Sequence, residues 1–275
     1  MLKDVLTITT AGSVDDGKST LIARLLLDTR SIPEDQLGVT LGDDIDPTKI
    51  ADLLDGLESE REQGITIDVA HRFFDSESRR YHLSDSPGHE QYTRNMATAA
   101  AGADALVLVI DASAGIKPQT RRHLDIAYRL GVRDFLVAVN KIDLVNFSKK
   151  RFVELESQVS DLFEVYPEAT FAAYPTSGVQ GDGVVRRGPR LRWFDGPTLL
   201  EALDGITSRK AASPNAVVSV QFQTKIGAKR VYFAALLGGS LNTGDLLVVK
   251  SGNVEATVSR LWVAGTETTT ASIGD

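Results

Sequence analysis

A glycine-rich run near the start of the chain constrains its fold more than any other feature. The run is Gly12-Ser13-Val14-Asp15-Asp16-Gly17-Lys18-Ser19, followed by Thr20, and it fits the phosphate-binding pattern G-x-x-x-x-G-K-[ST]. The β-branched residues 5–11 before it predict a strand, and residues 21–27 after it predict a helix. In that context successive backbone N–H groups point at one anion, and the helix N-terminus adds partial positive charge. The sequence therefore predicts an α/β nucleotide-binding domain, against the alternative of a chance match in a glycine-bearing turn.

Two polar side chains of this run suit a nucleotide and its metal ion. Lys18 has the length to reach the β- and γ-phosphates of a nucleotide, and the Ser19 hydroxyl is placed to bind Mg²⁺. The glycines allow the backbone to wrap tightly around the phosphates.

A second motif, Asp85-Ser86-Pro87-Gly88-His89, follows a short strand at residues 81–84, which we expect to pair as a hairpin with the strand before it. Asp85 suits a water-mediated contact to Mg²⁺, and Gly88 can bring its backbone N–H close to a γ-phosphate. His89 then lies where a group that orients the attacking water belongs. A surface histidine at a helix N-terminus is the alternative interpretation.

A third motif predicts which base is bound. A buried strand, residues 135–139, delivers Asn140-Lys141-Ile142-Asp143. The Asp143 carboxylate can accept both N1–H and the 2-amino group of guanine, whereas adenine leaves it unpaired, a difference that can reach ~10⁴-fold in affinity. Lys141 can pack its stem on the base, and the backbone of Thr176-Ser177-Gly178 can contact the guanine O6. A polar turn at a strand end is the alternative.

The remaining pattern predicts two domains. We expect a mostly parallel sheet with helices on both faces over residues 1–207, a linker at 208–215 and an incomplete antiparallel β-barrel at 216–275. Further elements of the first domain are predicted as helices 91–101, 117–130, 148–166 and 198–206 and strands 105–111 and 170–175. About four strands are predicted in the second, at 217–222, 231–236, 246–250 and 254–263. A free strand edge is an aggregation liability, so we expect either that the natural chain continues past Asp275 or that a partner covers the edge.

The charge and composition of the chain limit the classes of partner that it is expected to bind. The net charge of −7 disfavours a general nucleic-acid or membrane surface. The loop at 178–192 is locally basic, with Arg186, Arg187, Arg190 and Arg192. For these arginines we favour a solvated loop over an RNA contact, because the chain as a whole is acidic. There is no cysteine, and no apolar run approaches membrane-spanning length, so we expect a cytoplasmic protein without a membrane partner. Residues 31–63 are polar and predict a long loop, and long loops in compact domains are usually functional or disordered.

Together these motifs resemble those of the translation-factor-like GTPases, as do Gly64-Ile65-Thr66 and residues 115–121. The resemblance is closest to the GTP-hydrolysing large subunit of bacterial heterodimeric sulfate adenylyltransferase, and to the forms fused to adenylylsulfate kinase. It is carried by residues 14–22, 28–30, 34–37, 60–70, 87–98 and 193–200. Asp16 discriminates, since elongation factors usually have histidine there. The chain departs from the family at Ser86, at residues 38–49 and at Gly178, and it lacks the family's final β domain and the end of its second.

The resemblance implies that a small catalytic subunit makes adenylylsulfate and pyrophosphate from ATP and sulfate, and that GTP hydrolysis on this chain is coupled to that uphill reaction in a heterodimer. It implies catalytic roles for His89, Lys18, Thr66 and Gly88, and Mg²⁺ contacts from Ser19, Thr66 and, through water, Asp85. The implied coupling segments are residues 31–66 and 85–98. The predicted GTP-binding residues are Gly12, Ser13, Val14, Asp15, Asp16, Gly17, Lys18, Ser19, Thr20, Asp85, Ser86, Pro87, Gly88, His89, Asn140, Lys141, Ile142, Asp143, Ser177 and Gly178.

Two other functions stay open. A translation elongation-factor-like GTPase would bind RNA, which the net charge and Asp16 disfavour. A non-catalytic GTP-binding regulator would bind GTP without stimulated turnover. The missing C-terminal strands favour this regulator, and the intact Lys18, Thr66, Asp85 and His89 argue against it.

Overall fold

The computed structural model describes residues 4–32, 50, 68–207, 215–227, 229–250, 252, 254–263 and 265–272. The chain divides into two compact units, residues 1–207 and 208–275, and each is described here by itself. The predicted linker lies outside the described residues except for Asn215, as do Thr66 and most of the loop predicted at 31–63.

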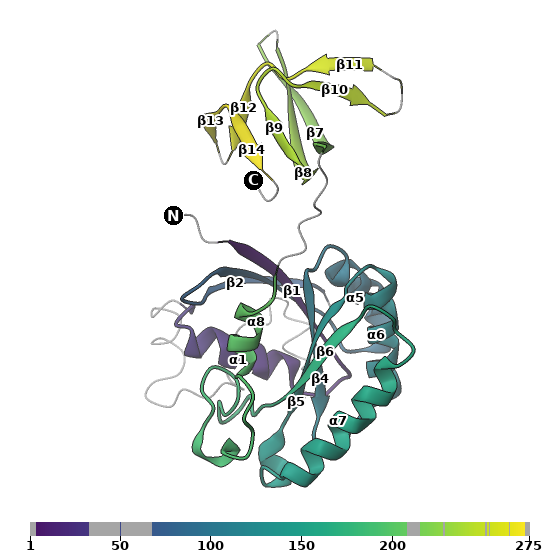
Figure 1. The fold of residues 1–275 in the computed structure, drawn as a ribbon, viewed down its shortest axis with the longest axis vertical. Helices are drawn as coiled ribbons and strands as arrows, with labels where there is room; N and C mark the ends of the chain where they lie inside the picture. The colour runs from purple at the N-terminus through teal and green to yellow at the C-terminus, as the bar shows by residue number, and fades with distance from the viewer. Residues whose placement is uncertain are drawn as a thin grey trace. The chain divides into compact units, whose positions relative to one another are not determined.

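The first unit is built on a six-stranded sheet (Figure 1). Its strand order is β2-β3-β1-β4-β5-β6, and only β2 runs antiparallel to its neighbour. The strands are β1 (Val5–Ala11), β2 (Ala70–Asp75), β3 (Arg80–Asp85), β4 (Ala105–Asp111), β5 (Asp134–Asn140) and β6 (Thr170–Pro175). The hairpin predicted before Asp85 is confirmed, with Phe74 opposite Tyr81.

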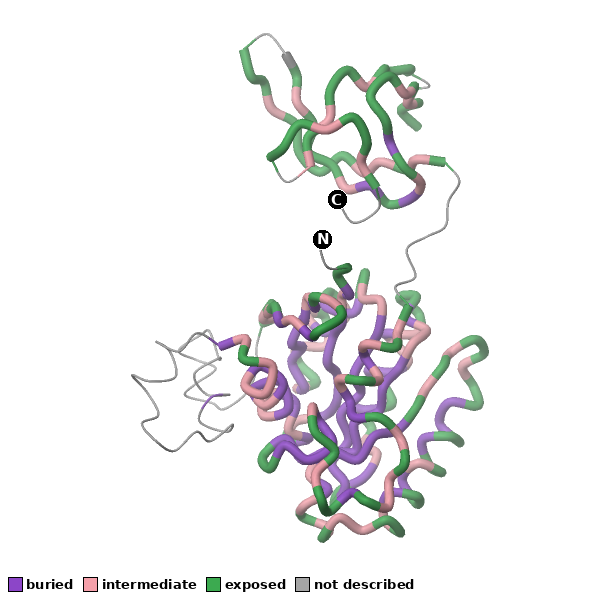
Figure 2. The backbone as a smooth tube through the Cα atoms, turned by 60° about the vertical axis from the view of Figure 1, so that its left-hand side comes forward, coloured by how far each residue is buried: buried purple, intermediate pink, exposed green. Residues whose placement is uncertain are grey.

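Helices cover both faces of this sheet, which confirms the predicted α/β class (Figures 1 and 2). One hydrophobic cluster lies under α1 (Lys18–Asp28) and α8 (Leu199–Asp204), and the other lies under α5 (Thr93–Ala100), α6 (Pro118–Arg129) and α7 (Lys149–Phe163). Strand β4 supplies alternate residues to each cluster, such as Val107 to the first and Leu108 to the second. This is why its sequence is a continuous apolar run. The short 3₁₀ turns are η1 (Glu90–Tyr92), η2 (Ile142–Val145) and η3 (Pro189–Leu191).

Capping residues explain where the helices begin. Thr198 accepts the Glu201 N–H at 3.3 Å and its own N–H is bonded to the Glu201 carboxylate at 2.7 Å, so α8 begins with a capping box. Ser148 accepts the Arg151 N–H at 3.2 Å in the same way for α7. The predicted helices 117–130 and 148–166 therefore start within one residue of their predicted positions, although α7 ends at Phe163.

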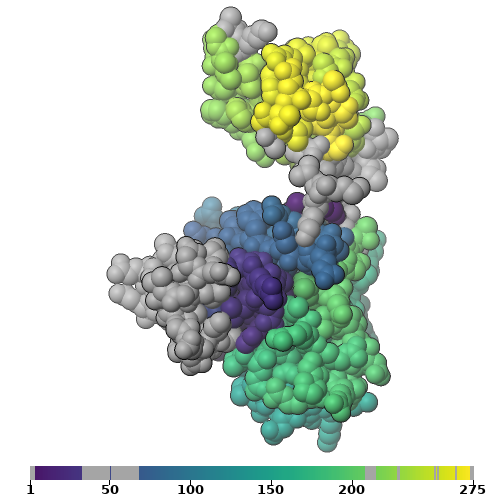
Figure 3. All heavy atoms as spheres, turned by 90° about the vertical axis from the view of Figure 1, so that its left-hand side faces the viewer, coloured from purple at the N-terminus to yellow at the C-terminus, as the bar shows by residue number. Residues whose placement is uncertain are grey.

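The last helix is also fixed to the β2–β3 hairpin. One oxygen of Asp204 accepts hydrogen bonds from the hydroxyls of Ser76, Ser78 and Tyr81, at 2.6, 2.5 and 2.6 Å. On the same face of the sheet, Arg24 of α1 donates to the carbonyls of Gly178 and Val179 at 3.1 and 2.5 Å. Figure 3 shows this side, with the purple surface of α1 next to the green surface of the segment after β6.

The second unit is an antiparallel β module, but the prediction of about four strands is wrong. Its described residues form eight strands, most of them short. They are β7 (Val217–Ile226), β8 (Lys229–Gly238), β9 (Ser240–Asn242), β10 (Leu246–Val249), β11 (Val254–Thr257), β12 (Leu261–Val263), β13 (Thr266–Thr268) and β14 (Thr270–Ser272). The predicted strand 254–263 is interrupted because the backbone of Val258 bonds to Asp245 and Gly244. Strands of three residues are too short to show an alternating pattern.

Candidate nucleotide-binding site

The three sequence motifs meet at one edge of the parallel sheet. Strand β1 leads into the glycine-rich run, β3 ends at Asp85, β5 ends at Asn140, and β6 leads to Ser177. The chain places β2 and β3 on one side of β1, and the connection after β3 then crosses to β4 on the other side, so the strand order reverses at β1. Ligands of open α/β sheets bind at such a switch point, beyond the carboxyl ends of the strands.

Two glycines allow the motifs to approach each other. Gly17 has a φ of 85°, and a Cβ there would lie 2.5 Å from the amide nitrogen of Asn140. A Cβ at Gly88 would collide with the ammonium of Lys18 and lie 3.0 Å from the Ser13 carbonyl oxygen. The second motif therefore packs against the glycine-rich run at a distance that a side chain at Gly88 would prevent.

Lys18 is buried inside the loop that it belongs to. Its Nζ donates to the carbonyl oxygens of Ser13 and Gly12, at 2.8 and 3.3 Å. Burial lowers the pKa of Lys18, while the negative charge of Asp85 opposes that shift. A lysine ammonium held among the backbone groups of a glycine-rich loop is a cation that can bind a phosphate group.

A partly buried ion pair holds the glycine-rich loop. The Asp16 carboxylate, which is 0% exposed, accepts the Ser13 N–H at 2.8 Å and a hydrogen bond from Lys117 Nζ at 2.6 Å. Lys117 also donates to the Val14 carbonyl at 3.0 Å. Burial raises the pKa of Asp16, and the bond from Lys117 acts against that rise. Asp16 thus shapes the loop through its side chain, and Lys117 is a participant that sequence reasoning missed.

His123 of α6 supports the loop from below, and sequence reasoning missed it too. Its Nδ1 accepts the Gly12 N–H at 3.2 Å, and its Nε2 lies 2.8 Å from the side-chain amide of Gln119. Burial, together with the nearby charges of Lys18 and Arg122, lowers the pKa of His123 to about 4. The ring is therefore neutral at pH 7. One histidine on a helix gives no sequence signal that separates this role from ordinary packing.

We expect the free energy of unfolding to fall as the pH is lowered from about 6.5 to about 4, because unfolded His123 binds a proton that the folded ring refuses. Above pH 6.5, the ordinary pKa of an unfolded histidine, the contribution of neutral His123 to the free energy of unfolding is complete. That contribution falls by at most about 3 kcal/mol as the pH approaches the folded pKa of about 4. Urea titrations across this range would measure it. His123→Asn keeps an acceptor near the Gly12 N–H and should flatten the profile, and equal slopes for both proteins would contradict the prediction.

The two polar side chains predicted in the second motif, Asp85 and His89, have different surroundings in the structure. Asp85 is buried and accepts a hydrogen bond from the Thr10 hydroxyl at 2.8 Å. The His89 ring instead accepts the Gln91 N–H at 3.4 Å, and so caps η1. That is the position that the surface-histidine alternative describes. Ser86 is buried and its hydroxyl bonds to the Thr10 carbonyl.

The Asn140–Asp143 motif is joined to the glycine-rich run. The Asn140 amide donates to the carbonyls of Asp16 and Gly17 at 3.0 and 3.3 Å, and its oxygen accepts the Gly178 N–H at 3.0 Å. Asp143 accepts the Ser177 hydroxyl at 2.6 Å. The structure therefore connects the glycine-rich run, the Asn140–Asp143 motif and the loop after β6 in one network.

Lys141 is fixed by an ion pair at the base of this network. Its Nζ lies 3.0 Å from a carboxylate oxygen of Asp111 and also donates to the Asp15 carbonyl. Burial acts to raise the pKa of Asp111, but hydrogen bonds from Ser113 and Lys141 hold that pKa at about 2. The stem of Lys141 is thus held beside the loop that precedes Lys18.

The arginine-rich loop makes intramolecular contacts at three of its four arginines. Arg190 bonds to Asp182 at 2.5 Å and lies 4.2 Å from the centre of the Phe147 ring. Arg187 donates to the Gly196 carbonyl at 2.8 Å, and Arg186 lies 3.9 Å from Asp28. These contacts use the charges to hold the loop on its own unit.

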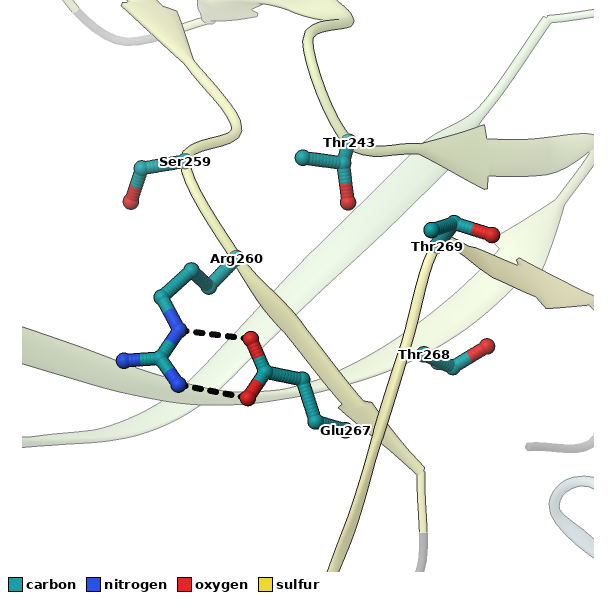
Figure 4. A pocket seen from close by; sticks show the side chains of 6 residues that line it. All are labelled: Thr243, Ser259, Arg260, Glu267, Thr268 and Thr269. Carbon is teal, nitrogen blue, oxygen red and sulfur yellow. Dashed lines mark hydrogen bonds and ion pairs between the residues drawn. The ribbon is translucent and has the colours of Figure 1, made fainter.

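The second unit has a shallow hollow of its own, which contains none of the predicted site residues (Figure 4). Arg260 and Glu267 face each other across it in a two-pronged ion pair, with N–O distances of 2.7 and 2.5 Å. The remaining lining residues are Thr243, Ser259, Thr268 and Thr269. Among the described residues that line the hollow, Arg260 is the one cation, and it is already paired with Glu267.

Within the residues that the structure describes, no group of three or more histidine, cysteine, aspartate or glutamate side chains could hold a metal ion by itself. None of the helices that the structure describes is long and apolar enough to cross a membrane.

Comparison with known proteins gives one family and one set of close relatives. Residues 3–209 match the family described as the elongation factor Tu GTP binding domain. Sulfate adenylyltransferase subunit 1 of Rhizobium meliloti (strain 1021) is 44% identical, over 93% of this chain and 53% of the relative. The proteins of that name from Salmonella arizonae and Vibrio campbellii are 42% and 41% identical, over 94% of this chain and 56% of their own length. The chain spans about half the length of these curated relatives.

Solved structures with the same fold are less similar in sequence. A bacterial selenocysteine-specific elongation factor, EF-Sec, has a TM-score of 0.58 at 24% identity, covering 100% of this chain and 41% of that one. Sup35 complexed with GDP has a TM-score of 0.56 at 25% identity, over 99% of this chain and 62% of that one. The GTP-bound GTPase-like domain of S. cerevisiae Ski7 has a TM-score of 0.64 at 18% identity, over 99% of this chain and 69% of that one.

Proposed function

Because the chain belongs to the family of elongation factor Tu GTP-binding domains, we propose that it is the GTP-hydrolysing subunit of a sulfate adenylyltransferase. The observation that carries this proposal is the 41–44% identity to sulfate adenylyltransferase subunit 1 over at least 93% of the chain. Identity to solved structures of the same fold is 18–25%. The partner we propose is a small catalytic subunit that makes adenylylsulfate and pyrophosphate from ATP and sulfate, in a cytoplasmic heterodimer.

The glycine-rich run is proposed to hold the phosphates. Lys18 exchanges its bonds to the Gly12 and Ser13 carbonyls for phosphate oxygens, and the backbone N–H groups of residues 14–19 donate to the same anion. The partly buried pair of Asp16 and Lys117 keeps the loop in shape while this happens. Asp143 selects guanine, with Ser177 fixing its carboxylate.

The oxygen donors near Lys18 fit a magnesium ion. We propose that Ser19 and Thr66 bind Mg²⁺ directly and that Asp85 contacts it through water, since hydroxyl and carboxylate oxygens are the ligands this ion prefers. When bound, Mg²⁺ neutralises charge on the β- and γ-phosphates. Thr66 lies outside the described residues, so its share of this proposal rests on the sequence.

Hydrolysis is proposed to depend on positioning. Gly88 donates its N–H to the γ-phosphate, beside Lys18 and without a side chain in the way. His89 leaves its bond to the Gln91 N–H and orients the attacking water. We further propose that residues 31–66 and 85–98 order around the γ-phosphate and relax after hydrolysis, which couples the site to the partner subunit.

The test is reconstitution with a small adenylyltransferase subunit, ATP and sulfate. We expect adenylylsulfate to form only when GTP is present, and GTP hydrolysis to rise when all components are mixed. Lys150→Met, a substitution far outside the motifs on the exposed face of α7, should behave as the unchanged chain.

Binding between the two chains is measured in the same sample. A stable complex that hydrolyses no GTP would replace this proposal with the GTP-binding regulator. RNA binding with no complex would favour an elongation-factor-like GTPase.

A further inference from the structure

One buried hydroxyl joins the two phosphate-side motifs. Thr10 lies two residues before Gly12, in β1, and is 2% exposed. Its hydroxyl donates to one carboxylate oxygen of Asp85 at 2.8 Å and accepts the Ser86 N–H at 3.4 Å. The Ser86 hydroxyl bonds back to the Thr10 carbonyl. Three hydrogen bonds thus fasten the start of the second motif to the strand that delivers the first.

The fold places these groups together through the strand register. Strands β1 and β3 are parallel, with Thr9 opposite Ser84, so Thr10 and Asp85 are next to each other at the ends of both strands. A threonine side chain is stiff because its Cβ is branched. The hydroxyl therefore has a fixed position from which it can restrict the rotation of the carboxylate.

We propose that Thr10 is a positioning residue that holds the Asp85 carboxylate in the orientation needed for its water-mediated contact to Mg²⁺. This inference rests on the proposed nucleotide site and goes beyond it, because the pattern G-x-x-x-x-G-K-[ST] begins at Gly12 and does not include Thr10.

Thr9 provides a matched control on the same strand. It is 0% exposed, and its hydroxyl donates at 3.0 Å to the backbone carbonyl of Ser84 rather than to a carboxylate. Thr9→Val and Thr10→Val each remove one buried hydroxyl from β1 without changing side-chain shape. Only the second removes a donor to Asp85.

The experiment measures release of a fluorescent GDP from the full chain over a range of Mg²⁺ concentrations and in EDTA. We expect Thr10→Val to raise the Mg²⁺ concentration for half-maximal slowing of release about tenfold, the size expected for losing one hydrogen bond to a charged group. Thr10→Ser keeps the hydroxyl and should restore the midpoint to within about twofold. Thr9→Val should leave it unchanged, and GDP affinity in EDTA should be the same for all variants.

Coupling to Asp85 completes the test. In an Asp85→Asn background, Thr10→Val should shift the Mg²⁺ midpoint no further, because the two changes remove one interaction. Equal shifts from Thr9→Val and Thr10→Val, or full additivity with Asp85→Asn, would overturn the inference. Failure of the unchanged chain to bind GDP would instead refute the proposed nucleotide site. If Thr10→Val does not fold, Thr10→Ala takes its place in the same comparisons.

Discussion

Replacing Lys18 with methionine is expected to lower the affinity for GDP and GTP by about 1,000-fold. Each hydrogen bond from the ammonium to a phosphate is charge-assisted and contributes about 1.5–3 kcal/mol, so losing two removes about three decades of affinity. Methionine keeps the length of the side chain inside the loop. Fluorescent-nucleotide titration would measure the change.

The control for this substitution is Lys150→Met, which removes the same charge from an exposed position on α7. It should leave nucleotide affinity unchanged. Because Lys18 also donates to the Gly12 and Ser13 carbonyls, circular dichroism must show that the variant is folded. A folded variant with normal affinity would refute the phosphate-loop interpretation.

Replacing Asp143 with asparagine is expected to weaken GDP binding by about 100- to 10,000-fold and to relax the preference for guanine. The carboxylate accepts two N–H groups of guanine, whereas an amide presents a donor to one of them. Xanthine has an oxygen in place of the 2-amino group, so the variant should gain affinity for XDP. Competition among GDP, XDP and ADP would measure the preference.

Asp125→Asn is the matched control for that change, since Asp125 pairs with Arg129 on the exposed side of α6. It should leave base preference as it is. Ser177→Ala should have a smaller effect in the same direction as Asp143→Asn, because the Ser177 hydroxyl fixes the carboxylate. Unchanged discrimination between GDP and ADP in Asp143→Asn would refute the assignment of base recognition.

Much of the first unit could be predicted from local patterns. Strands 105–111 and 170–175 have the predicted bounds, and the motifs that follow the strands meet at one edge of the sheet. The antiparallel class of the second unit was also predictable, but its number of strands was not. Three-residue strands such as β9 and β14 exist because they pair with each other, and no run of residues within either one encodes that pairing.

The supports of the site could not be predicted, because each joins distant residues. Lys117 is 101 residues from Asp16, and His123 is 111 residues from Gly12. The sequence does not distinguish a lysine or histidine that contacts a distant loop from one that faces solvent, because the neighbouring residues can be the same in both cases. His89 is a different case, because here a sequence motif exists but does not specify the position of the side chain. Its motif predicts a catalytic role, but the cap on η1 depends on side-chain rotation that no sequence pattern specifies.

The position of Asn140 has a consequence for how such a site can change during evolution. One amide group braces the backbone around Gly17 and at the same time anchors Gly178, so the two halves of the proposed site share one support. In that proposed site, a substitution at Asn140 would disturb the glycine-rich run together with the loop after β6. A change of base preference through Asp143 would instead leave the hydrogen bonds of Asn140 in place.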